Sequence, residues 1–198
     1  LSNATDDTYN MISVDGDTST NDTVLLLANG LAGNPEIKQG TPEFDEFAAA
    51  LHVINEYLAK KIAGDGEGAT ALFTVKAEGC SSKEQAKKLA KSVCCSNLVK
   101  TAIAGHDANW GRVLCAMGYA GVDFDPGKVE LYFESAAGKI QICEGGTAVD
   151  YSEEEATKIL SEAEVTAIIS VGEGDETATA WGCDLTHAYI EINADYRS

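Results

Sequence analysis

The stretch TPEFDEFAAALHVINEYLAKKIAG, at positions 41–64, predicts the clearest helix in the chain. Thr41 can cap its first turn, Pro42 fits the position that follows, and Gly64 can end it. Its large apolar residues recur every three or four positions and therefore share one face. They are Phe44, Phe47, Leu51, Ile54, Leu58 and Ile62. This helix must pack its apolar face against other elements.

Strand and helix patterns alternate on both sides of this helix without a repeat period, which predicts an α/β or α+β fold. We expect strands over residues 9–14, 72–77, 129–134, 139–143, 164–171 and 189–193. We expect helices over residues 23–29, 81–104 and 109–119, and a short one opened by Ser152. Ser81 and Glu84 read as a capping box for the long helix, as do Ser152 and Glu155 for the short one. A second domain is expected to begin near Ala71.

Composition and charge exclude several classes of protein. The chain has 198 residues, of which 44% are hydrophobic and 23% charged, so we expect a folded domain rather than disorder. Its net charge of −18 disfavours binding to nucleic acid. No apolar run approaches the roughly 20 residues that span a membrane. The first residue is Leu1, and no signal peptide follows, so we expect a processed chain or a fragment.

Six cysteines are present, and none forms a Cys-x-x-Cys pair. Because the spacing of zinc ligands and clustered histidines are both missing, we interpret them as buried free thiols in a reducing cytoplasm. They are Cys80, Cys94, Cys95, Cys115, Cys143 and Cys183. We therefore expect no metal site and a cytoplasmic location.

Two polar loops are candidates for a site. The segment DGDTSTND at 15–22 is either the lining of a site or a turn that leads into a helix cap. The segment GDGEGAT at 64–70 has the glycines of a phosphate loop but no Lys, and its carboxylates would repel phosphate. Its central Glu67 could face a cationic ligand, although a helix end and turn would explain the same residues.

Two further segments allow a functional or a structural interpretation. The segment GHDANWGR at 105–112 favours a helix–helix turn over a catalytic triad, because His106 and Asp107 are sequence neighbours and no activated serine motif is present. The basic residues of 81–112 could meet the phosphates of a cofactor or an acidic partner, but a solvated helix face is the commoner explanation.

Four segments in this order resemble one known family. They are VDGDTSTND at 14–22, DGEGAT at 65–70, NWGR at 109–112 and INADYRS at 192–198. Together they resemble the β chain of the ornithine acetyltransferase family, the bifunctional glutamate N-acetyltransferases of arginine biosynthesis. The resemblance covers nearly the whole chain.

The resemblance implies an enzyme that moves acetyl from N-acetylornithine to glutamate through a threonine acyl-enzyme. Family precursors cut themselves into α and β chains, and two of each form the assembly. The resemblance implies a layered α-β-β-α sandwich, here residues 1–70, with a smaller α/β lobe at 71–185. Some members also accept acetyl-CoA, which stays open as a co-substrate, and no other cofactor is expected.

The family's substrate contacts correspond to three residues of this chain, Glu67, Asn193 and Ser198. The tail at 186–198 is then expected to return to the glycine loop. The family's nucleophilic Thr precedes the position of Leu1, so no catalytic residue is assigned, and this chain alone is expected to be inactive. His106 stands where the family usually has Arg. The alternative is a non-catalytic binding or structural module of the same fold.

Overall fold

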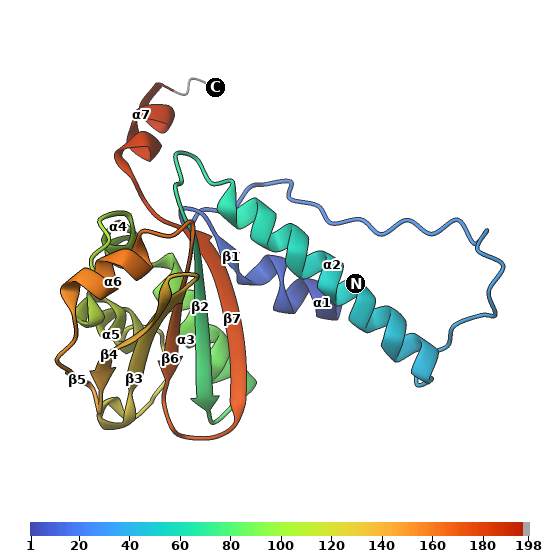
Figure 1. The fold of residues 1–198 in the computed structure, drawn as a ribbon. Helices are drawn as coiled ribbons and strands as arrows, with labels where there is room; N and C mark the ends of the chain where they lie inside the picture. The colour runs from blue at the N-terminus through green and yellow to red at the C-terminus, as the bar shows by residue number, and fades with distance from the viewer. Residues whose placement is uncertain (196–198) are drawn as a thin grey trace.

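The structure is a computed structural model, and it describes residues 1–195. Within these residues, seven strands form one mixed sheet in the order β1-β7-β2-β6-β3-β4-β5 (Figure 1). The strands are β1 (Ile12–Ser13), β2 (Leu72–Cys80), β3 (Glu130–Ser135), β4 (Gly138–Glu144), β5 (Thr147–Ala148), β6 (Glu164–Ser170) and β7 (Glu176–Cys183). The β1–β7 and β2–β6 pairs are parallel, and the other pairs are antiparallel. The predicted α/β class is confirmed.

Seven α-helices accompany the sheet in the described part of the chain. They are α1 (Ser2–Asp7), α2 (Pro42–Gly64), α3 (Lys83–Cys95), α4 (Asn97–Ala104), α5 (Trp110–Gly118), α6 (Glu153–Leu160) and α7 (His187–Asp195). The core lies between the sheet and α3. Alternate residues of β2, including Phe73 and Val75, are fully buried, and so are Leu89 and Val93 of α3.

Three of the expected helix starts carry side-chain caps, and those at Thr41 and Ser152 were predicted from the sequence. The Thr41 hydroxyl accepts from the Phe44 N–H, and the Ser152 hydroxyl accepts from the Glu155 N–H at 3.2 Å. Asn109 caps α5 in the same way. These contacts satisfy N–H groups that the first helical turn leaves without partners.

The helix expected over residues 81–104 is two helices. The chain breaks at Ser96, whose hydroxyl accepts from the Val99 N–H and so starts α4. The first cap is also shifted by one residue, because Ser82 rather than Ser81 accepts from the Gln85 N–H at 3.1 Å. The side-chain amide oxygen of Gln85 in turn accepts from the Ser81 N–H, so Gln85 takes the role predicted for Glu84.

The first part of the chain departs most from prediction. Residues 23–29, expected as a helix, are extended without regular structure. Of residues 9–14, expected as a strand, only Ile12–Ser13 form one (β1), and Tyr9–Met11 form a 3-10 turn before it. Helix α1 was not predicted. The side chains of Leu25 and Leu27 are 76% and 87% exposed, so nothing in the described chain packs against this segment to order it.

Two predictions near the C-terminus were also wrong. Residues 189–193 lie in helix α7 rather than in a strand, and strand β7 was missed. Strand β7 inserts between β1 and β2 in the sheet. Figure 1 shows α7 projecting from the end of the sheet, above the loop that follows α2.

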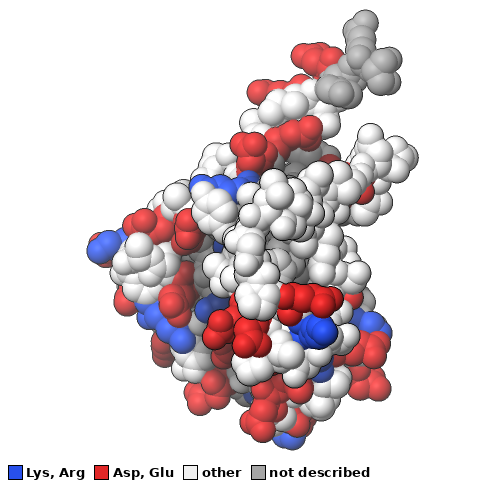
Figure 2. Space-filling view, turned by 90° about the vertical axis from the view of Figure 1, so that its right-hand side faces the viewer, with Lys and Arg blue, Asp and Glu red and all other residues white. Residues whose placement is uncertain are grey.

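The apolar face of α2 is uncovered in the described part of the chain. Ile54 and Ile62 are 56% and 50% exposed, whereas the helix rests on the rest of the fold through Asn55, Ala59 and Ala63. Figure 1 shows α2 and the segment before it extending away from the sheet. In Figure 2, where this side faces the viewer, a broad area without charged residues crosses the molecule. This surface has the character of an interface rather than of a free exterior.

No helix among residues 1–195 combines the length and the apolarity that crossing a membrane requires.

Candidate functional site

The glycine loop between α2 and β2 packs tightly against the end of the chain. A Cβ atom at Gly66 would lie 2.6 Å from the Cys183 sulfur, and one at Gly68 would lie 2.7 Å from the Ala188 side chain. Gly68 also has a φ of +69°, which non-glycine residues rarely adopt. The glycines therefore do more than end α2, because they let the loop approach the segment that leads into α7.

Glu67, at the centre of this loop, meets the tail of the chain. The Asn193 amide donates to the Glu67 carboxylate at 2.9 Å, across 126 residues of sequence, and also to the Tyr189 carbonyl at 3.0 Å. Both side chains are exposed, so a ligand can reach them. Ser198, the third residue that the family resemblance assigned, lies outside the described residues.

The polar loop at residues 15–22 also contacts α7, close to Glu67 and Asn193. The Tyr189 hydroxyl donates to the Asp15 carboxylate at 2.9 Å. This hydrogen bond, with burial and the charges of Asp15, Glu67 and Asp17, raises the pKa of Tyr189 above its usual value. Three segments that are distant in sequence thus form one cluster, which we call the acidic cluster: Asp15, Asp17, Glu67, Tyr189 and Asn193.

The acidic cluster has the chemistry of a site for a cation. It offers three carboxylates, one amide and one phenol. An ammonium group fits such a set, because a carboxylate binds it by a charge-assisted hydrogen bond. Sequence reasoning found Glu67 and Asn193 through the family resemblance and treated the first loop as a candidate. It missed Tyr189 as a member because it placed that residue in a strand.

The 105–112 segment forms the turn between α4 and α5 and the first residues of α5. His106 has a φ of +53°, and its Nδ1 lies 3.3 Å from the Ser161 hydroxyl. Asp107 accepts instead from the Asn109 amide at 3.0 Å, and Arg112 donates to the Leu98 carbonyl. These contacts support the helix–helix turn and give no support to a His–Asp pair.

The basic side chains of residues 81–112 are used within the fold. The Lys87 ammonium lies 2.7 Å from the Asp7 carboxylate, and that of Lys83 lies 3.8 Å from it. Burial raises the pKa of Asp7, but the hydrogen bond and charge of Lys87 and the charge of Lys83 outweigh it and lower the pKa below its usual value. Lys91 donates to two backbone carbonyls near the start of the chain. A structural role for this segment explains these contacts better than a role in binding phosphates.

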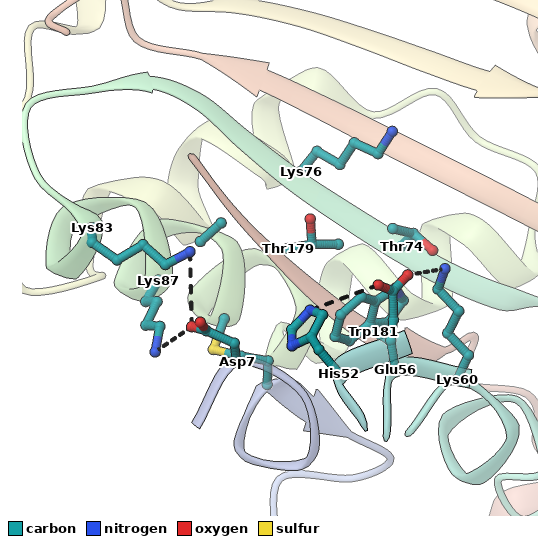
Figure 3. A pocket seen from close by; sticks show the side chains of 12 residues that line it. Asp7, His52, Glu56, Lys60, Thr74, Lys76, Lys83, Lys87, Thr179 and Trp181 are labelled. Carbon is teal, nitrogen blue, oxygen red and sulfur yellow. Dashed lines mark hydrogen bonds and ion pairs between the residues drawn. The ribbon is translucent and has the colours of Figure 1, made fainter. Parts of the chain in front are cut away.

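A cavity of about 300 Å³ lies where these lysines approach α2 and strands β2 and β7 (Figure 3). Glu56 accepts from Lys60 at 2.5 Å and lies 4.0 Å from the His52 imidazole. The Lys60 ammonium also lies 5.6 Å from the centre of the Trp181 ring. His52, Lys60, Lys83 and Lys87 thus have acidic or aromatic partners of their own, and none of the residues that line the cavity belongs to the acidic cluster.

The cysteines of the described chain are free thiols. Four are buried, as expected, but Cys95 is half-buried and Cys115 is exposed. Burial raises the pKa of Cys94 to about 12 and that of Cys80 to about 11, so these two thiols are unreactive at neutral pH. Among residues 1–195, no group of three His, Cys, Asp or Glu side chains is placed to hold a metal ion.

Comparison with known proteins identifies the family of this chain. All residues from 1 to 198 match the family model described as the ArgJ family. The chain belongs to the ArgJ family. It is 53% identical to the "Arginine biosynthesis bifunctional protein ArgJ" of Thermotoga neapolitana, over 98% of this chain and 49% of that protein. It is 47% identical to the "Glutamate N-acetyltransferase" of Methanopyrus kandleri, over 100% of this chain and 50% of that protein.

A solved structure supports the same assignment. The crystal structure of the arginine biosynthesis bifunctional protein ArgJ from Bacillus halodurans matches with a TM-score of 0.93 and 44% identity. The match covers 99% of this chain and 91% of the solved chain. The resemblance drawn from the four sequence segments is therefore confirmed. The chain spans about half the length of the curated relatives it matches.

Proposed function

We propose that this ArgJ-family chain is a β-chain portion of an ornithine acetyltransferase and supplies one side of its substrate site. The reaction transfers acetyl from N-acetylornithine to glutamate in arginine biosynthesis, in the cytoplasm. The observation that carries the proposal is the contact between Glu67 and Asn193, because it joins a carboxylate and an amide that are 126 residues apart in the sequence, at an exposed site.

The chemistry of the acidic cluster suits this substrate. N-acetylornithine carries one free ammonium, which is costly to bury without a partner, and Glu67 is exposed beside two further carboxylates. The Asn193 amide can turn from Glu67 to the amino-acid head of the substrate, and the family resemblance assigns the Ser198 hydroxyl to the same substrate. In this proposal the residues of the acidic cluster bind the substrate, and residues outside this chain carry out the covalent chemistry.

In the proposed reaction, a threonine hydroxyl attacks the acetamide carbonyl of N-acetylornithine. The bond to nitrogen breaks, ornithine leaves with the proton, and the acetyl group remains as an ester. The glutamate amine then attacks this ester, which forms N-acetylglutamate and frees the threonine. We place the threonine upstream of Leu1, at the start of the β chain, and the oxyanion donors in the α chain.

The partner that we propose is an α chain from the same precursor, in an assembly of two α and two β chains. The exposed face of α2 is one surface for it. The segment at 23–28 is another, because TVLLLA is apolar on both sides when extended, which is typical of a strand inside a sheet. The alternative of a non-catalytic module has no support from the comparisons, whose named relatives are biosynthetic proteins.

The uncovered surface predicts that the isolated chain self-associates. Replacing Leu25 and Leu27 together with Asp should shift it toward monomer, because two of the most exposed apolar side chains are removed. Sedimentation velocity over a range of concentrations measures the effect. Leu98→Asp, at an exposed leucine on α4, is the matched control and should change nothing. A wild-type chain that stays monomeric throughout would contradict the prediction.

Replacing the tail residues should weaken use of N-acetylornithine in the two-chain enzyme. We expect Asn193→Ala to lower kcat/KM by about 3- to 10-fold, and Ser198→Ala by less, since a neutral hydrogen bond is worth roughly 0.5–1.5 kcal/mol. Melting temperatures should stay at the wild-type value, because Asn193 is exposed and lies in a helix without buried residues. Unchanged kinetics for Asn193→Ala would remove this residue from the proposed site.

A further inference from the structure

A buried carboxylate lies beneath the glycine loop. Asp184 is only 2% exposed, and its carboxylate accepts three hydrogen bonds. They come from the Thr70 N–H at 2.7 Å, the Thr70 hydroxyl at 2.5 Å and the Ala71 N–H at 3.0 Å. The Asp184 N–H donates back to the Ala71 carbonyl at 3.2 Å. Bonds to a charged acceptor are stronger than neutral ones, so Asp184 fixes the end of the loop that carries Glu67.

Thr186, two residues later, connects the loop to the tail. Its hydroxyl donates to the Gly68 carbonyl at 2.7 Å and accepts from the Ala188 N–H at 3.2 Å. Gly68 directly follows Glu67, whereas Ala188 lies in the first turn of α7, the helix that carries Asn193. One side chain thus sets the position of both elements that meet at the acidic cluster.

The segment that holds these two residues is itself anchored in the core. Lys100 is fully buried, its ammonium donates to the Cys183 carbonyl, and the Nζ atom lies 3.6 Å from the Cys183 sulfur. The Lys100 carbonyl accepts from the Leu185 N–H at 3.2 Å. Helix α4 therefore holds the chain on both sides of Asp184, so this carboxylate has a rigid support.

We propose that Asp184 and Thr186 are positioning residues for the acetyltransferase site: they hold the Glu67 loop and α7 in the register that lets Glu67 and Asn193 face the same substrate. This inference rests on the proposed function. Neither side chain needs to touch the substrate, because each acts through the backbone of residues 68–71 or of α7. Pre-positioning of this kind lowers the cost of ordering a site when the substrate binds.

The test compares Thr186→Val with Thr186→Ser in the two-chain enzyme. Valine has nearly the shape of threonine but cannot donate to Gly68 or accept from Ala188, whereas serine keeps the hydroxyl. We expect Thr186→Val to raise the KM for N-acetylornithine by about 3- to 10-fold, the range of one or two neutral hydrogen bonds, with a smaller change in kcat. Thr186→Ser should restore KM to near the wild-type value.

Ser152→Ala is the matched control. It also removes a side-chain hydroxyl that accepts a backbone N–H at the start of a helix, but in α6, away from the acidic cluster. It should lower the melting temperature without changing KM, which separates loss of stability from loss of positioning. Asp184→Asn should raise KM more than Thr186→Val does. If Asp184→Asn fails to fold, the comparison of Thr186→Val with Thr186→Ser still tests the positioning role.

Glu67→Gln, measured in the same series, separates this inference from the proposed function. If Glu67→Gln raises KM but Thr186→Val leaves it unchanged, the positioning role is overturned and the substrate site stands. If both leave KM unchanged, the proposed site fails, and the positioning role fails with it. If Thr186→Val and Thr186→Ser raise KM equally, the positioning role is also overturned, because loss of the hydroxyl would not explain the change in KM.

Discussion

The purified 198-residue chain, assayed alone, is expected to show no transfer of acetyl from N-acetylornithine to glutamate. In the proposed enzyme the nucleophilic threonine and the oxyanion donors lie outside this chain. Loss of a single oxyanion donor typically lowers the rate by about 10²- to 10³-fold, and loss of the nucleophile removes the covalent route altogether. The activity should therefore fall below detection rather than merely decrease.

The measurement is formation of N-acetylglutamate and ornithine, followed with N-acetylornithine as donor and again with acetyl-CoA. The positive control is a single precursor chain that contains both halves found in the relatives and can cut itself before the threonine, and it should show turnover. Transfer by the isolated chain at about 1 s⁻¹ or faster, the usual range of enzymes, would contradict the expectation and place a nucleophile within residues 1–198.

In the two-chain enzyme, Glu67→Gln is expected to lower kcat/KM for N-acetylornithine by about 10- to 100-fold. The variant keeps the shape of the side chain and removes the charge that pairs with the substrate ammonium. A hydrogen bond to a charged group is worth roughly 1.5–3 kcal/mol, which corresponds to this range. The melting temperature should not change, because Glu67 is exposed and lies in a loop.

Glu154→Gln provides the control for this variant. Glu154 is likewise exposed, but it lies in α6 and is not part of the acidic cluster. It should leave both kinetics and stability unaltered. Wild-type kinetics in Glu67→Gln would remove Glu67 from the substrate site, whereas a large drop in its melting temperature would assign Glu67 a structural role instead.

Sequence patterns predicted the elements whose signals are local. The caps at Thr41 and Ser152 act within one helical turn, so their residues identify the helix starts without reference to the rest of the fold. The break at Ser96 was missed because the apolar pattern continues on both sides of it. The side chain that starts α4 is the only local sign of the break.

Elements that depend on distant partners were not predictable in this way. Strand β7 contains small residues such as Ala178 and Ala180, and it is a strand because β1 and β2 pair with it on either side. The apolar run at 23–28 is too short for periodicity to distinguish a helix from a strand, and within the described chain it has no partner that would select either. The pattern of residues 189–193 was equally ambiguous between strand and helix, and these residues lie in helix α7.

The candidate site shows the same division. The glycine loop made Glu67 a candidate, whereas Asn193 was found only through the family resemblance, and their hydrogen bond depends on how α7 returns to the loop. Tyr189 and Thr186 gave no sequence signal, because their roles arise from contacts with Asp15 and Gly68. Such contacts follow from the topology of the sheet rather than from any spacing along the chain.

The position of β7 in the sheet determines when this chain can fold during synthesis. The last strand to be made pairs with β1, the first, at Ile12 and Trp181, and with β2 along most of its length. Pairing across such long separations carries a large loop-closure cost and slows folding. On the ribosome, β1 and the exposed edge of β2 must wait for almost the entire chain to emerge. The tail with Asn193 follows directly after β7, so the site assembles in the same late step that completes the sheet.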